Sequence, residues 1–139
     1  MLFILSKQAD PENAAHAIVK LETELAKVQW SRTELRDANK RYNLYQVDKL
    51  SDLSPKFDWN EFFTATGVKG LKEINVNTPS FFKGLDPIVQ NTSVDVWKQY
   101  FHFRLLDAYA TVLPKDYSNA HFELHMKELT GIPEQKPRW

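Results

Sequence analysis

The sequence predicts an all-α protein, a multi-helical lobe of five to six helices with little or no strand. Apolar residues recur at helical spacing through most of the chain. Helix start and stop signals divide it into short segments, from Asp10-Pro11 at the first long helix to Gly131 after the last. A length of 139 residues allows one domain but hardly two independent ones, so we expect a single helical unit over residues 1–139.

The first long helix is expected to run from Pro11 to about Lys40. Asp10 supplies a side-chain oxygen for the free amides, and Glu12 lies near the positive end of the helix dipole. The apolar positions at helical spacing are Ala14, Ile18, Leu21, Leu25 and Val28. The last third, from Trp30 to Arg41, is far more polar, so the helix either leaves its neighbours there or ends early.

The middle of the chain predicts shorter elements. Residues 43–53 indicate a short helix or turn built on Val47, Leu50 and Leu53. The next helix covers Phe57 to Phe63, with Asp58 as its cap and Gly67 as its left-handed stop. Residues 73–76 alternate between apolar and polar and are expected to be extended. Thr78-Pro79 then begins a helix that buries Phe81, Phe82, Leu85 and Ile88, and Pro87 should kink or divide it.

Two helices are expected in the last third. Thr92-Ser93-Val94-Asp95 fits a capping box, and the helix that it opens should run to about Leu113, before Pro114. Apolar residues surround nearly the whole circumference of this helix, which is typical of a central helix. They are Trp97, Tyr100, Phe101, Phe103, Leu105, Leu106, Tyr109 and Val112. The final helix should span roughly Tyr117 to Thr130 and end at Gly131.

Composition excludes several classes of function. The chain has 18 basic and 18 acidic side chains, so it has no polybasic surface for a nucleic acid. The absence of cysteine excludes a disulfide scaffold, a Cys-ligated zinc or iron–sulfur site and a cysteine nucleophile. No segment approaches the ~18 consecutive apolar residues that span a bilayer, and no glycine-rich phosphate-binding motif is present. The aromatic residues are expected to form core rather than a cofactor or sugar site.

The sharpest candidate for chemistry is the pair His121 and His125. Histidines at positions i and i+4 share one helical face, which suits a tetrahedral zinc ion. The metallopeptidase motif H-E-x-x-H requires the glutamate directly after the first histidine, whereas Glu123 is one position later, roughly 100° further round the helix. Glu128 would be a possible third ligand. We interpret the pair as surface or partly buried histidines; the alternatives are a zinc site or a small hydrolase using His121 and Glu123.

Two further polar groups have a structural and a functional interpretation. His102 lies beside Arg104 and Asp107, which could orient a ligand but are expected to tie neighbouring helices together. His16 is expected to be solvated. A dense charged group next to a tryptophan and a tyrosine is expected to be a network that fixes a helix end, with a binding role as the alternative. Its members are Glu34, Arg36 and Asp37, beside Trp30 and Tyr42.

This charged group also carries a family resemblance. Trp30, Glu34, Arg36, Asp37, Tyr42 and Asn43 match the pattern W-x-x-x-E-x-R-D followed closely by Y-N. The segment resembles the amino-terminal domain of neprilysin-type zinc metallopeptidases, the family of neprilysin, the endothelin-converting enzymes and bacterial endopeptidases. Phe57-x-Trp59, residues 78–82, residues 97–113 and residues 131–139 follow in the family's order, so the similarity spans nearly the whole chain.

The resemblance implies a place in a larger enzyme. It identifies the chain as a fragment of the helical lobe that faces the zinc-bearing lobe across an enclosed chamber and admits peptides rather than folded proteins. The family's H-E-x-x-H helix has no matching position here, so the resemblance implies no catalytic, cofactor-binding or metal-binding residue in this chain. It also implies no metal at His121 and His125. Zinc, peptide substrates and the zinc-bearing lobe as partner belong to the parent enzyme, and the isolated chain should neither cleave peptides nor hold zinc stoichiometrically.

The two ends indicate a chain cut from a longer protein. The sequence begins in an apolar run, Met1 to Leu5, and stops on Trp139. The absence of cysteine favours a bacterial-type relative. The parent protein of this chain would then belong to the cell envelope or periplasm. A severed lobe should expose apolar surface and self-associate. The alternative function is a free-standing helical interaction module without enzymatic activity; neither hypothesis includes a nucleic acid or a membrane segment.

Overall fold

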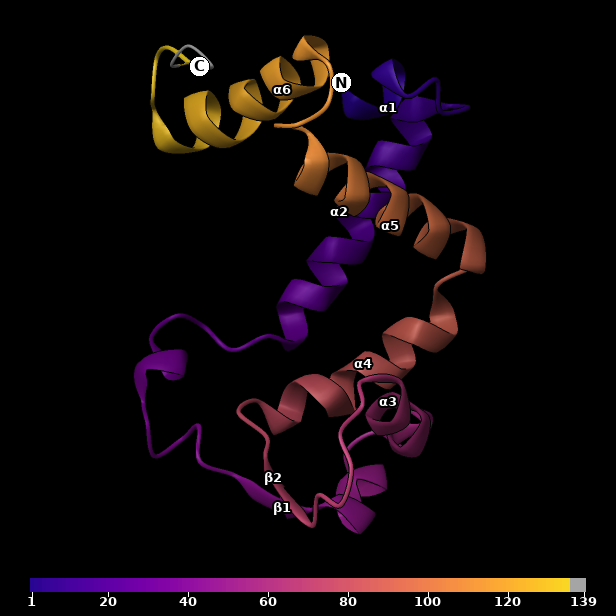
Figure 1. Ribbon diagram of the computed structural model, residues 1–139, viewed down its shortest axis with the longest axis vertical. Helices are drawn as coiled ribbons and strands as arrows, with labels where there is room; N and C mark the ends of the chain where they lie inside the picture. The colour runs from indigo at the N-terminus through magenta and orange to yellow at the C-terminus, as the bar shows by residue number, and fades with distance from the viewer. Residues whose placement is uncertain (136–139) are drawn as a thin grey trace. The chain divides into compact units, whose positions relative to one another are not determined.

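A computed structural model describes residues 1–135 as an all-α protein with one small two-stranded sheet, which confirms the predicted fold class (Figure 1). Lys136 to Trp139, the end of the segment that resembles the metallopeptidase family, lie outside the described residues. The chain divides into two compact units, which are described separately. One is formed by residues 20–92, and the other by residues 1–19 together with the chain from Ser93 onward.

The unit that contains the N-terminus is built around helix packing. Its elements are α1 (Leu2–Leu5), the first part of α2 (Pro11–Val28), α5 (Val94–Tyr109), α6 (Lys115–Phe122) and a π-helical continuation, η3 (Glu123–Glu128). Phe3, Ala14 and Ile18 are buried together, so α1 and α2 share one apolar cluster. Three half-buried residues of α5 pack against this cluster: Tyr100, Phe103 and Leu106.

The second unit has its core beside the sheet. After the end of α2 come η1 (Glu34–Arg36), β1 (Leu44–Gln46), η2 (Val47–Asp52), α3 (Trp59–Ala65), β2 (Glu73–Asn75) and α4 (Pro79–Asn91). The strands β1 and β2 lie side by side (Figure 1) and pair antiparallel, with Tyr45 opposite Ile74. Leu50, Leu53 and Val76 form the buried cluster. Half-buried side chains from β1, η2, α3, β2 and α4 surround it: Tyr45, Val47, Trp59, Phe63, Ile74 and Phe82.

Several predicted caps are present. The Asp58 side chain accepts a hydrogen bond from the Glu61 amide at 2.8 Å, and Asp10 accepts one from the Asn13 amide at 3.4 Å. Gly67 and Gly131 have φ values of 74° and 73°, the left-handed conformation that ends a helix most readily at glycine. The extended piece predicted for residues 73–76 is present as the strand β2 (Glu73–Asn75). These caps depend on residues within one turn of the helix end, so sequence spacing was sufficient to locate them.

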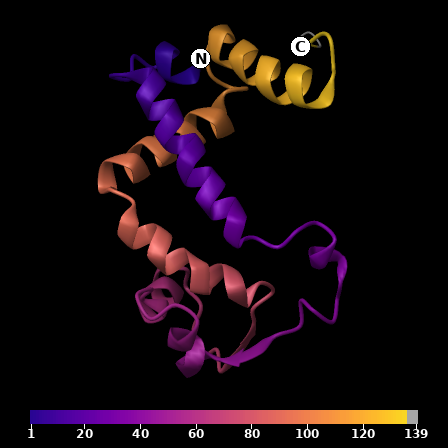
Figure 2. The same ribbon diagram turned by 180° about the vertical axis from the view of Figure 1, so that it is seen from behind.

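The predicted helix from Pro11 to Lys40 is too long, because α2 ends at Val28. Side chains beyond that point bond to the backbone amides that a helix would need. The Asp37 carboxylate accepts from the amides of Asn39 and Lys40, at 2.9 and 3.1 Å. Figure 2 shows the resulting irregular path between α2 and β1 from behind. The polar composition of this stretch therefore indicates an early helix end.

Three expectations for the later helices also need correction. Pro87 lies inside α4 and does not divide it, since α4 is one helix from Pro79 to Asn91; the kink, the other expected effect, stays a prediction. The cap of α5 is Ser93, whose hydroxyl accepts from the Val96 amide at 3.4 Å, because Thr92 is still the C-cap of α4. The helix α5 ends at Tyr109 rather than near Leu113.

The helix α5 is also less enclosed than its composition predicts. None of its residues is fully buried, and Phe101, Leu105 and Tyr109 are each more than half exposed. The spacing of these three, at i, i+4 and i+8, places them in one stripe along the helix. Residues 43–53, expected as a short helix or turn, contribute the strand β1 as well as the 3₁₀-helix η2. No helix among residues 1–135 is long and apolar enough to cross a membrane.

Candidate functional site

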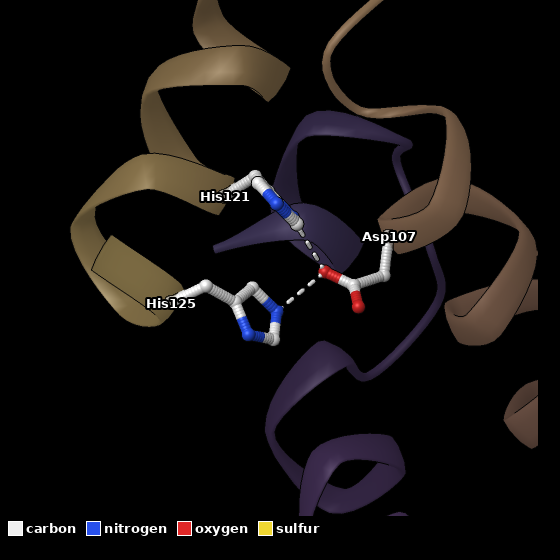
Figure 3. Close-up of side chains that lie close together, drawn as sticks. All are labelled: Asp107, His121 and His125. Carbon is white, nitrogen blue, oxygen red and sulfur yellow. Dashed lines mark hydrogen bonds and ion pairs between the residues drawn. The ribbon is translucent and has the colours of Figure 1, made fainter. Parts of the chain in front are cut away.

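A turn at Pro114 brings the end of α5 against the last helix. Pro114 is the N-cap of α6, and its carbonyl accepts a hydrogen bond from the Tyr117 amide at 2.9 Å. The chain therefore reverses within a few residues of Tyr109. Asp107, near the end of α5, comes to face His121 in α6 and His125 in η3 (Figure 3).

The three side chains converge on one oxygen atom. Asp107 Oδ1 lies 2.9 Å from His121 Nδ1 and 2.8 Å from His125 Nε2. Both distances are normal for a charge-assisted hydrogen bond, with a ring N–H as donor and the carboxylate as acceptor. The imidazole centroids are 4.4 Å apart. We call these three residues the Asp107 cluster.

The Asp107 cluster is largely shielded from water. The side-chain exposure is 13% for Asp107, 20% for His121 and 33% for His125. Burial by itself raises the pKa of the Asp107 carboxyl, but the hydrogen bonds from His121 and His125 outweigh it, so this pKa lies below its ordinary value. Asp107 is therefore held as a carboxylate between two imidazoles.

This arrangement differs from each grouping that the sequence suggests. The two histidines are partly buried, as expected, but their acidic partner is Asp107 rather than Glu123 or Glu128. Glu123 forms an ion pair with Lys127 at 2.8 Å. Asp107 lies 14 and 18 residues before its partners, so no spacing rule marks the contact. The sequence signals for this contact were the helix boundary at Pro114 and the acidic side chain of Asp107 on a largely apolar helix.

The other two histidines lie apart from the Asp107 cluster. The ring of His102 lies 5.9 Å from the ring of Phe3 and belongs to the packing between α5 and α1. His16, on α2, is exposed, as predicted. The expectation that Asp107 ties helices together is met, because its contacts join α5 to the last helix.

The charged group around Trp30 forms a local network, as predicted. Trp30 Nε1 donates to Ser80 Oγ at 2.6 Å, which ties the segment after α2 to the start of α4. The ammonium of Lys40 lies 4.8 Å above the Trp30 ring and 2.6 Å from Glu34 Oε1. Glu34 Oε2 accepts from the amide and hydroxyl of Ser31, at 2.8 and 2.9 Å. Trp30 and Glu34, two residues of the pattern that resembles the metallopeptidase family, therefore fix the path of the chain after α2.

Within the same group, the remaining residues have different places. Asp37 caps its own turn, as described above, and Arg36 ends the 3₁₀-helix η1. Tyr42 is 69% exposed, so it does not pack over the charged group. The predicted network is therefore centred on Glu34, and Trp30 links it to α4.

The contacts of Glu34 predict its titration. The hydrogen bond from Lys40, followed by those from Ser31, lowers the pKa of Glu34 to about 2 from an ordinary value of 4.5. Because the folded-state pKa is the lower one, the network stabilises the fold fully above about pH 4.5 and loses this effect as the pH falls towards about 2. Carboxyl resonances followed by NMR should show this titration, and Lys40→Met should move the pKa upwards. A Glu34 pKa that is the same in the Lys40→Met variant and the unaltered chain would contradict the assignment.

Comparison with known proteins places the chain in a defined context. The whole sequence, residues 1–139, matches the amino-terminal profile of "Peptidase family M13". It is 25% identical over 129 residues to "Neprilysin-11" of Caenorhabditis elegans, covering 88% of this chain and 15% of that protein. It is also 25% identical over 134 residues to an "Endothelin-converting enzyme homolog" of Locusta migratoria, covering 88% of this chain and 18% of that protein.

A solved structure has the same fold. The crystal structure of the Mycobacterium tuberculosis zinc metalloprotease Zmp1 in complex with an inhibitor superposes with a TM-score of 0.85. The two sequences are 31% identical, and the match covers 94% of this chain and 20% of that one. The chain thus spans less than a fifth of the length of the two curated relatives.

Proposed function

The chain belongs to peptidase family M13, and from this membership we propose that it is a non-catalytic segment of the helical lobe of a zinc metalloendopeptidase. The observation that carries the proposal is the match of all 139 residues to the amino-terminal profile of the family. The Trp30–Asn43 segment, which carries the family resemblance, supports the same assignment. Its Trp30–Ser80 and Lys40–Glu34 contacts hold the chain in place and suggest no catalytic role.

The chemistry of the chain supports a non-catalytic role. The sequence contains no H-E-x-x-H, the motif that holds zinc and places the glutamate next to the metal-bound water in such peptidases. The nearest approximation, His121 to His125, does not fit that zinc site, because Glu123 is paired with Lys127 and the acid beside the histidines is Asp107. We therefore derive no hydrolytic step through residues of this chain.

The exposed stripe of α5 supports a role within a larger assembly. Phe101, Leu105 and Tyr109 present apolar surface along one helical face, and large apolar patches on a protein surface mark contact sites. We propose that this segment packs against the rest of the peptidase and forms part of the wall that limits substrates to peptides. The same surface also suits the alternative, a free-standing helical interaction module.

The test combines the longer reading frame with an assay of substrate size. If the proposal is right, the frame encodes H-E-x-x-H downstream, and the full-length product cleaves a quenched fluorescent peptide but not a folded protein of similar local sequence. Changing the glutamate of that motif to glutamine should abolish cleavage. The 139-residue chain alone should give no chelator-sensitive cleavage, because it lacks the zinc motif.

The alternatives predict different results. A reading frame that closes without H-E-x-x-H would contradict the peptidase segment and favour the interaction module. Chelator-sensitive cleavage by the 139-residue chain, lost in Glu123→Gln, would favour a small hydrolase instead. Equal cleavage of the peptide and the folded protein by the full-length product would contradict the proposed chamber wall.

A further inference from the structure

We propose that Asp107, His121 and His125 form a binding site for one divalent transition-metal ion of the zinc class. This reverses the expectation, based on the sequence alone, that the histidine pair carries no metal. The new observation is the carboxylate of Asp107, which the fold places between the two imidazoles (Figure 3). The proposal stands independently of the proposed function, since only residues of this chain take part.

The donor atoms match the preferences of zinc. Zinc binds imidazole nitrogen and carboxylate oxygen at about 2.0–2.2 Å, most often with tetrahedral geometry. Tetrahedral ligands at these lengths are about 3.3 Å apart. The nitrogen–oxygen separations in the Asp107 cluster are 2.8 and 2.9 Å, and all three donor atoms lie within 4.8 Å of one another. Small side-chain rotations would therefore bring the three donor atoms to the spacing of a metal site.

Metal binding would replace the two hydrogen bonds of the Asp107 cluster, and the protonation of neutral imidazoles is compatible with this replacement. In the hydrogen-bonded state, His121 Nδ1 and His125 Nε2 face the carboxylate oxygen. In the metal-bound state, each of these nitrogens offers a lone pair, and each neutral ring carries its proton on its other nitrogen. The carboxylate offsets one of the two positive charges of the ion. The two hydrogen bonds that the ion would replace join side chains only.

The surroundings favour an open rather than a closed site. The exposure of His125, 33%, leaves one side of the cluster accessible to solvent, so a water molecule would complete the coordination of three protein ligands. His125 lies in the π-helical stretch Glu123–Glu128, a local widening of the helix that is frequent at functional sites. The bound ion would join α5 to the last helix more firmly than the hydrogen bonds alone.

The experiment titrates the 139-residue chain, freed of metal, with zinc chloride in an isothermal calorimeter. We expect one equivalent to bind. Asp107→Asn and His125→Gln are the matched variants, because each new side chain retains hydrogen-bonding capacity but is a poorer ligand for zinc. Asp107→Asn should weaken binding by more than about 100-fold, beyond the roughly 10- to 100-fold that the loss of an outer-shell partner typically costs, and His125→Gln should abolish the one-site isotherm. His16→Gln, which removes an exposed imidazole elsewhere, should bind zinc as the unaltered chain does.

A second measurement assigns the ligands directly. Zinc should shift the NMR ring resonances of His121 and His125 and leave those of His16 and His102 unchanged. Circular dichroism of each variant tests whether the helix content is retained. No saturable one-site binding by the unaltered chain would overturn the proposal, as would zinc affinity that is unchanged in both Asp107→Asn and His125→Gln.

Discussion

Replacing Leu50 with alanine is expected to lower the free energy of unfolding by about 2–5 kcal/mol. The Leu50 side chain has no exposed surface and lies in the buried cluster with Leu53 and Val76. Truncation removes its methyl groups from the core and leaves a cavity, because the surrounding side chains relax only partly. With a 3₁₀-helix and two short strands around it, this core has few other buried residues to compensate.

Urea denaturation, followed by the fluorescence of the chain's tryptophans and by circular dichroism, measures this effect. Trp59 packs against the Leu50 cluster and should report its loss. Leu44→Ala is the matched control, because Leu44 is 51% exposed on β1, and it should change the unfolding free energy by less than about 0.5 kcal/mol. Equal losses in the two variants would show that Leu50 does not anchor the core.

Replacing Gly84 with alanine is expected to destabilise the protein by about 1–3 kcal/mol, although alanine is the better helix former. Gly84 lies inside α4, where its backbone approaches α2. A Cβ atom at this position would be 2.4 Å from Val28 Cγ1 and 2.8 Å from Val28 Cβ. Both distances are far below van der Waals contact, and the stiff valine side chain has no rotation that moves its Cβ away. Overpacking therefore outweighs the gain of about 1 kcal/mol in helix propensity.

A double-mutant cycle tests the cause. Val28→Ala removes the methyl group nearest to the new Cβ, so it should recover part of the stability lost in Gly84→Ala, and the two changes should not add. Lys83→Ala is the control, because Lys83 is an exposed neighbour on the same helix. A Gly84→Ala variant more stable than the unaltered chain would show that α2 and α4 do not approach so closely here.

Elements with a local cause are the ones that the sequence predicted well. Asp58 caps α3 through an amide three residues ahead, and Gly131 ends the last helix through its own left-handed conformation. Both depend on residues within one helical turn, so spacing is sufficient to find them. The family assignment was predicted for the same reason of order and spacing, and the match over residues 1–139 confirms it.

Elements whose backbone can form either of two hydrogen-bonding patterns were predicted less well. The stretch after Val28 has enough helix-forming residues to extend α2. The side chains of Ser31, Glu34 and Asp37 instead accept hydrogen bonds from its backbone amides and form turns. The strand β1 exists only because β2, about 30 residues later in the chain, supplies its partner, with Leu44 opposite Asn75. Neither outcome follows from periodicity, since each depends on which of two bonding patterns prevails.

The sequence by itself determined the all-α class, the cap of α3 at Asp58 and the peptidase family, because these depend on neighbouring residues and on the order of motifs. The tertiary structure decided which acid meets the histidines. The sequence pairs His121 and His125 by helical spacing, but the turn at Pro114 brings Asp107 to them from another helix. The tertiary structure also decided that the stripe of Phe101, Leu105 and Tyr109 on α5 is exposed, since burial depends on what packs beside a helix rather than on the composition of the helix.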